Sequence, residues 1–187
     1  MTGLPARGKT HISRRVARYL DFFHAQPVKL FDVASYRRRT CGALKDAAWF
    51  DNSNAEAVAL RDMVNRMALE DMAAFLEEHH NGVGKLGHKM ISRNISITKQ
   101  IELFTLYSAI LDSTNPTFAR RKRIIERIQH TGAKVLFIEV SCDNEEFLTE
   151  IYQTTAATSP DYAGIDPIDA AKDYRARIAN YKVVDPL

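Results

Sequence analysis

Gly3-Leu4-Pro5-Ala6-Arg7-Gly8-Lys9-Thr10, near the start of the chain, is the segment with the strongest sequence signal. It matches the pattern G-x-x-x-x-G-K-[ST] of a phosphate-binding loop at every fixed position. In such a loop, glycines let backbone N–H groups turn toward phosphates at the positive end of the following helix. The lysine reaches the outer phosphates, and the hydroxyl meets Mg²⁺. The pattern predicts an ATP site formed by Gly3, Ala6, Arg7, Gly8, Lys9 and Thr10.

A phosphate-binding loop needs a buried strand before it and a helix after it, and the surrounding residues predict only the helix. Ile12, Val16 and Leu20 recur at helical spacing, so a helix is expected over residues 10–23. A buried strand should precede the loop, yet only Met1 and Thr2 lie upstream of it. Either the sequence is incomplete, or the sheet is built without its usual first strand and is weakened by this.

The rest of the chain alternates between strand and helix patterns. Apolar, β-prone runs at 28–33, 103–111 and 134–140 predict strands that are covered on both faces. Helices are expected at 54–80, between Pro116 and Gly132, around 147–151 and from Asp166-Pro167 onward. This order predicts an α/β fold of the P-loop NTPase type, with a mainly parallel sheet flanked by helices. Residues 1–187 are expected to form a single domain, with an inserted loop at about 82–101.

Composition limits the classes of function. The chain has 187 residues, of which 45% are hydrophobic, which is enough for a real core. A net charge of +3 permits an anionic ligand without demanding nucleic acid. The two cysteines are far apart and form neither a disulfide framework nor a zinc pattern, which favours a reducing, cytoplasmic location. No run approaches the ~20 apolar residues of a membrane span.

Two segments rich in basic residues and histidine each allow a weaker alternative interpretation. The first 20 residues contain five basic side chains and no acid, which could mimic a mitochondrial transit peptide, but the phosphate loop explains the same residues. His79, His80 and His88 could offer metal ligands. Without matching carboxylate or thiolate spacing, solvated loop histidines are favoured.

Asp112 and several arginines complete the candidate site. Asp112 directly follows an apolar run, where phosphate-loop proteins carry an acid that assists Mg²⁺; alternatively it starts a turn. Arginine clusters follow two of the predicted strands, and guanidinium groups suit phosphate, although surface charge is the alternative. Arg177 and Tyr181 are four residues apart and share a helix face.

Five segments resemble, in the same order, the kinase domain of the 6-phosphofructo-2-kinase/fructose-2,6-bisphosphatase family. They are the loop at 3–10, Tyr36-Arg37-Arg38, Asp112-Ser113-Thr114-Asn115 with Arg120-Arg121, Phe137-Ile138-Glu139 with Cys142-Asp143, and Ser159-Pro160-Asp161-Tyr162. Together they span nearly the whole chain, and the first and last are specific to this family.

The resemblance implies transfer of the γ-phosphoryl group of ATP to the 2-hydroxyl of fructose 6-phosphate. Lys9, Asp112 and Thr114 would be catalytic, and Thr10 and Asp112 would assist Mg²⁺. The implied substrate-binding residues are Arg37, Arg61, Thr114, Arg120, Arg177 and Tyr181. The expected partner is this small-molecule substrate, not nucleic acid or a membrane, and a homodimer is left open.

The sequence also departs from the family. A family lysine four residues before the motif proline is matched by Ala156, and a family asparagine of the nucleotide pocket is matched by Ile151. Extra residues fall at 82–101, and no phosphatase domain is present in the sequence. A catalytically weak or inactive nucleotide-binding pseudoenzyme is therefore the alternative, and a small-metabolite kinase with another substrate is a third, weaker one.

Overall fold

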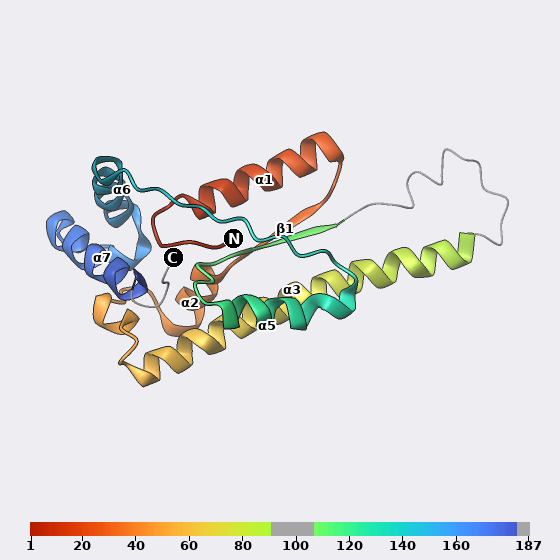
Figure 1. Cartoon of the computed structure of the whole chain (residues 1–187), viewed down its shortest axis with the longest axis horizontal. Coiled ribbons are helices and arrows are strands. Elements are labelled where there is room, and N and C mark those ends of the chain that lie inside the picture. Colours follow the sequence, from red (N-terminus) through yellow and green to blue (C-terminus); the bar gives the residue numbers. More distant parts are fainter. Residues whose placement is uncertain (91–106, 183–187) are drawn as a thin grey trace.

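The computed structural model describes residues 1–90 and 107–182, without the side chains of residues 80–90. Its elements are α1 (Lys9–His24), β1 (Val28–Asp32), α2 (Val33–Cys41), the 3-10 helix η1 (Ala47–Phe50), α3 (Ala55–Met90), β2 (Ser108–Asp112), α5 (Phe118–Ile128), η3 (Gln129–Thr131), α6 (Glu145–Thr158), η4 (Pro160–Tyr162) and α7 (Pro167–Lys182). Figure 1 shows α3 and α5 side by side below the sheet, with α1 above it and α6 and α7 together at one end.

The sheet of the described residues is small and parallel. β1 and β2 pair in a register that sets Val28 against Ser108 and Asp32 against Asp112. Because both strands run in the same direction, their carboxyl ends meet at one edge of the sheet, and each ends in an aspartate. The α/β class is confirmed at this level, since helices cover a parallel pair of strands.

The prediction of a strand at 134–140 is wrong. In this segment only Glu139 forms a β-bridge with a described residue, Thr2, through hydrogen bonds from Thr2 N to Ile138 O (2.9 Å) and from Val140 N to Thr2 O (3.1 Å). A cavity of about 850 Å³ lies between much of the segment and β2. An apolar, β-prone run is not enough for a strand, because a ladder also needs a partner within ~5 Å.

The helices begin where the sequence places capping residues. The side chain of Asn54 accepts from Ala57 N (3.0 Å) at the start of α3, and that of Asp166 accepts from Ile168 N (2.9 Å) at the start of α7. The loop expected at 82–101 is partly wrong, because residues 82–90 continue α3 as helix. Glycine lowers helix stability by only ~1 kcal/mol per residue, so a helix already formed can extend through it. Residues 91–101 lie outside the described part.

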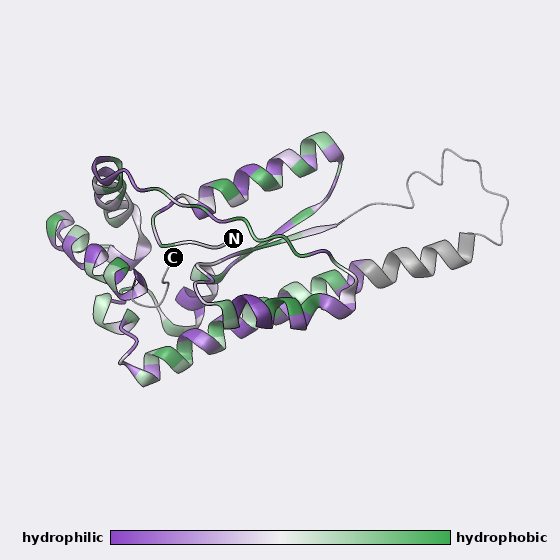
Figure 2. Ribbon diagram, viewed as in Figure 1, coloured by the Kyte–Doolittle hydropathy of each residue, from purple (hydrophilic) through white to green (hydrophobic). Residues whose placement is uncertain are grey.

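Two apolar clusters form the interior of the described part of the chain. The first joins the sheet to α3 and α5 and includes Phe31, Val64 and Leu111. The second lies between α6, η4 and α7 and includes Leu148 and Tyr174. Figure 2 shows apolar and polar residues mixed along these helices, as expected of helices that are covered on one face. Among the described residues, no helix is long and apolar enough to cross a membrane.

A substitution at Gly3 tests how closely the phosphate-binding loop packs against Val140. Its φ is +115°, and a Cβ added there would lie 2.5 Å from the carbonyl oxygen of Val140. Gly3→Ala should therefore lower the free energy of unfolding by about 1–3 kcal/mol beyond the backbone strain itself. Urea unfolding monitored by circular dichroism would measure this change.

Gly42→Ala is the matched control, because Gly42 has a φ of +81° and open space around the added Cβ. Equal losses of stability in the two variants would contradict the packing of the loop against Val140.

Candidate active site

The phosphate-binding loop leads directly into the N-terminus of α1. Gly8 has a φ of +86° and caps the helix, and Ala6 also has a positive φ of 57°. The ammonium group of Lys9 donates to the carbonyl oxygen of Leu4 within the loop. Gly3 N donates to Thr114 O (3.1 Å), which holds the start of the loop beside the residues that follow β2. The loop is thus anchored next to the carboxyl edge of the sheet.

Burial lowers the pKa of Lys9 from its ordinary value of 10.5 to about 8, although the charge of Asp112 partly opposes this shift. Since the protonated amine is disfavoured in the folded state, Lys9 reduces stability at neutral pH. This cost is relieved as the pH rises from about 8 to 10.5, where the unfolded chain still holds the proton. An anion placed beside Lys9 would therefore stabilise its protonated amine.

Asp112 lies at the end of β2, facing Lys9 and Thr10. Burial raises its pKa above the ordinary value of 3.8, a hydrogen bond from Thr10 lowers it, and the charge of Asp32 raises it further. Asp32 is its register partner at the end of β1, where its carboxylate accepts from Ala34 N (2.9 Å) and caps α2. A buried carboxylate of raised pKa is suited to accept a proton or to contact a cation.

A cavity of about 360 Å³ opens at this edge of the sheet, between the loop and α7. Six basic and four acidic side chains line it, which makes its charge positive. The basic ones are Lys9, Arg37, Arg38, Arg61, Arg120 and Arg177. Clustered guanidinium groups favour an anionic ligand with planar oxygen pairs, such as a phosphate or carboxylate.

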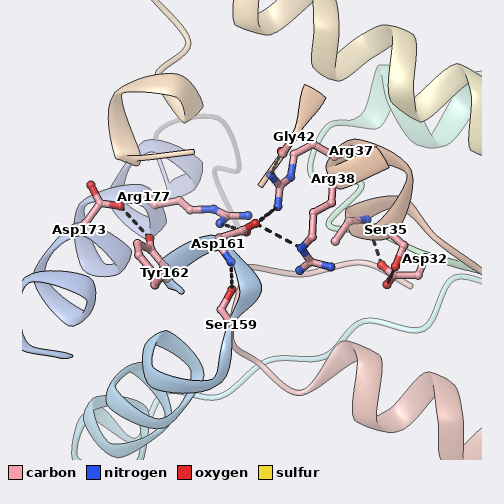
Figure 3. A network of polar contacts seen from close by, with 11 residues as sticks. Asp32, Ser35, Arg37, Arg38, Gly42, Ser159, Asp161, Tyr162, Asp173 and Arg177 are labelled. Carbon is pink, nitrogen blue, oxygen red and sulfur yellow. Dashed lines mark hydrogen bonds and ion pairs between the residues drawn. The ribbon is translucent and has the colours of Figure 1, made fainter. Parts of the chain in front are cut away.

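Asp161 organises three of these arginines. Its carboxylate, only 2% exposed, accepts from Arg37 (2.7 Å), Arg38 (3.2 Å) and Arg177 (3.1 Å). Figure 3 shows the three guanidinium groups, from α2 and α7, converging on this one side chain of η4. Burial alone would raise the pKa of Asp161, but the hydrogen bond and charge of Arg37, with the charges of Arg177 and Arg38, hold it below the ordinary value of 3.8.

The other predicted substrate residues are held by separate contacts. Arg61 of α3 donates to Phe50 O (2.6 Å) and Asp51 O (3.2 Å), which ties α3 to η1. Arg120 of α5 forms an ion pair with Asp62 of α3. Tyr181 lies one turn beyond Arg177 on α7, and both line the cavity, as their spacing predicted.

The structure brings most of the predicted site residues together around this cavity. Its lining includes Ala6, Lys9, Thr10, Arg37, Arg61, Asp112, Thr114, Arg120, Arg177 and Tyr181. Gly3, Arg7 and Gly8 do not line it. Arg7 points toward α6 instead, where it donates to the hydroxyl of Tyr152 (2.9 Å) and braces the loop.

Sequence reasoning assigned no role to two residues that shape this site. Asp161 lies within the Ser-Pro-Asp-Tyr segment quoted above. Its role is visible only in the structure, where it pairs with Arg37, 124 positions away in the sequence. Asp32 follows a predicted strand just as Asp112 does, so the same signal was available for it. Of the three histidines considered as metal ligands, only His79 has a side chain in the described part, because those of His80 and His88 lie outside it.

The residues present fit the magnesium ion that a phosphate loop implies. Thr10 and Asp112 offer oxygen atoms, the ligands that Mg²⁺ prefers, and lie within hydrogen-bonding reach of each other. Two protein oxygens are a normal share, because Mg²⁺ usually keeps several waters and takes the rest from substrate phosphates.

Comparison with known proteins adds an independent finding. The family model described as 6-phosphofructo-2-kinase matches residues 1–87 and 88–186. A protein of Gallus gallus named "6-phosphofructo-2-kinase/fructose-2,6-bisphosphatase" is 31% identical over 188 residues, covering 100% of this chain and 34% of that protein. The protein of that name from Caenorhabditis elegans is 34% identical over 188 residues, covering 97% and 35%.

The human "6-phosphofructo-2-kinase/fructose-2,6-bisphosphatase 3" is 30% identical over 190 residues, which cover 100% of this chain and 32% of that protein. The chain therefore spans about a third of the length of these relatives.

Asp161→Asn should lower the free energy of unfolding by about 3–5 kcal/mol at pH 7, because it leaves three buried or half-buried arginines without their counter-charge. The contribution of Asp161 is present above pH 4 and is lost as the pH falls through its lowered pKa. The variant should therefore lose less stability on acidification than the parent does. Asp143→Asn, at an exposed position, is the control. Identical acid profiles for the parent and Asp161→Asn would contradict this account.

Proposed function

Because the chain belongs to the 6-phosphofructo-2-kinase family, whose members are phosphotransferases, we propose that it binds Mg·ATP and fructose 6-phosphate. It transfers the γ-phosphoryl group to the 2-hydroxyl and yields fructose 2,6-bisphosphate and ADP. We further propose that the chain forms one domain of the P-loop NTPase type and works in the cytoplasm.

One observation carries this proposal: part of the phosphate loop, including Lys9 and Thr10, lines the same cavity as Asp112 and four of the predicted arginines. Phosphoryl transfer depends mainly on positioning and on neutralising charge spread over the phosphoryl oxygens. A cavity with a surplus of cations and one carboxylate of raised pKa supplies both.

Each residue has a defined task in this scheme. Lys9 and the loop amides bind the outer phosphates, and Thr10 and Asp112 orient the metal, which when bound neutralises charge on the transferring group. Asp112 also receives the proton of the 2-hydroxyl. The hydroxyl oxygen forms the new bond to the γ-phosphorus, and the bond between this phosphorus and the oxygen of ADP breaks. Thr114 lies beside the sugar, while Arg177, Arg61 and Tyr181 hold its phosphate and Arg37 and Arg120 add positive charge.

A second candidate, a weak or inactive nucleotide-binding relative, is favoured by one specific observation. Ala156, which matches the family lysine, is 1% exposed and packs within the second apolar cluster. It does not line the cavity, whereas Thr155 beside it does. A lysine that entered the cavity from α6 would therefore extend most directly from position 155.

Production of fructose 2,6-bisphosphate from Mg·ATP and fructose 6-phosphate tests the proposal. We expect slow turnover by the parent chain and an increase of about 10²-fold in Thr155→Lys, by analogy with the effect of one donor to developing charge. Thr154→Lys, at an exposed position of α6 that does not line the cavity, is the control. If no product forms with any variant while the nucleotide still binds, the inactive alternative holds.

Lys9→Met separates a functional lysine from a structural one. Without its poorly tolerated charge, the unliganded variant should be more stable than the parent by about 1–3 kcal/mol at pH 7. It should also lose the rise in melting temperature that Mg·ATP gives the parent, because the cation aimed at the outer phosphates is gone. Thermal denaturation with and without Mg·ATP measures both effects. A thermal shift that the variant retains in full would rule out the nucleotide site.

A further inference from the structure

Phe50 lies among three arginines of the cavity, Arg37, Arg61 and Arg177, which form the arginine cluster. It has no role in the scheme above. Its side chain is 2% exposed, yet it lines the cavity together with the arginines. The guanidinium carbon of Arg177 lies 3.5 Å from the ring centroid, and those of Arg37 and Arg61 lie at 5.5 Å and 6.0 Å. All three distances are within the range of cation–π attraction.

The ring itself is held firmly. At the start of η1, Ala47 N donates to Asp173 (2.9 Å), and Asn180 donates to Ala47 O (2.9 Å), so two turns of α7 fix this short helix. Arg61 of α3 fixes its other end through the carbonyl oxygen of Phe50 (2.6 Å). The backbone of η1 is therefore held by α7 and Arg61, without a contribution from Arg37 or Arg177.

The guanidinium group of Arg177 has two fixed contacts and one donor without a partner among the described residues. Its guanidinium stacks on Phe50, and one terminal nitrogen donates to Asp161 (3.1 Å). Its Nε is buried and has no hydrogen-bond partner among the described residues. A buried donor without an acceptor is costly, and a phosphate oxygen would satisfy it.

We propose that Phe50 is a positioning residue for the phosphate group of the sugar substrate, an inference that rests on the proposed function. Its ring orients the guanidinium plane of Arg177 and brackets Arg37 and Arg61, so that three mutually repelling cations point into one cavity. Asp161 forms ion pairs with two of them, Arg37 and Arg177. Preorganisation of this kind lowers the entropy lost when the ligand binds.

The test compares Phe50→Leu with Phe31→Leu. Phe31 is also 2% exposed, but it belongs to the first apolar cluster, and the cation over its ring is Lys29, which does not line the cavity. Calorimetry with a chain loaded with Mg²⁺ and a non-hydrolysable ATP analogue should show that Phe50→Leu weakens fructose 6-phosphate about tenfold. The affinity for the ATP analogue should change less than twofold, and Phe31→Leu should change neither. Phe50→Tyr, which keeps the ring face, should retain the affinity for the sugar phosphate.

Two further readouts keep this inference separate from the proposed function. The Arg177 Nε–Hε signal in NMR should be shifted by the ring current in the parent and lose that shift in Phe50→Leu, or in Phe50→Met if the leucine variant does not fold. Inorganic phosphate serves as the second probe. If the parent binds phosphate but not fructose 6-phosphate, the proposed function fails, and the loss of phosphate affinity in the variant still decides the role of Phe50. An unchanged affinity in the leucine or methionine variant, or a parent that binds neither anion, overturns the inference.

Discussion

The ion pairs of Asp161 connect the elements that carry the two apolar clusters of the described residues. One apolar cluster joins the sheet to α3 and α5, and the other lies between α6, η4 and α7. The carboxylate of Asp161 links α2, which packs on α3, to α7, which belongs to the second cluster. Because a buried carboxylate is tolerated only with partners, this bridge also fixes where the arginines lie, and so it defines one wall of the cavity.

The cavity keeps charged groups close together at a cost to stability. Lys9 holds a pKa of about 8, and Asp112 lies beside a second carboxylate, Asp32. Both arrangements are unfavourable in the free protein, and the metal and phosphates proposed to bind between them would offset this cost. This pattern is expected of a site shaped for a ligand rather than for stability.

Local signals in the sequence predicted much of the fold. The glycine pattern and helical periodicity located the loop and α1, and capping residues located α3 and α7. The strand expected at 134–140 failed because a ladder depends on a partner that periodicity does not describe. Phe50 and Asp161 were missed for a similar reason, since their roles exist only through contacts with residues distant in sequence, such as Arg37 and Arg177.

The most direct test of the central claim is a crystal structure of the chain with Mg²⁺, a non-hydrolysable ATP analogue and fructose 6-phosphate. The outer phosphates should contact Lys9 and the loop amides, and the sugar phosphate should contact Arg177. The 2-hydroxyl should then lie between the γ-phosphate and Asp112. A nucleotide outside the loop, or a sugar phosphate bound away from the arginine cluster, would contradict the account.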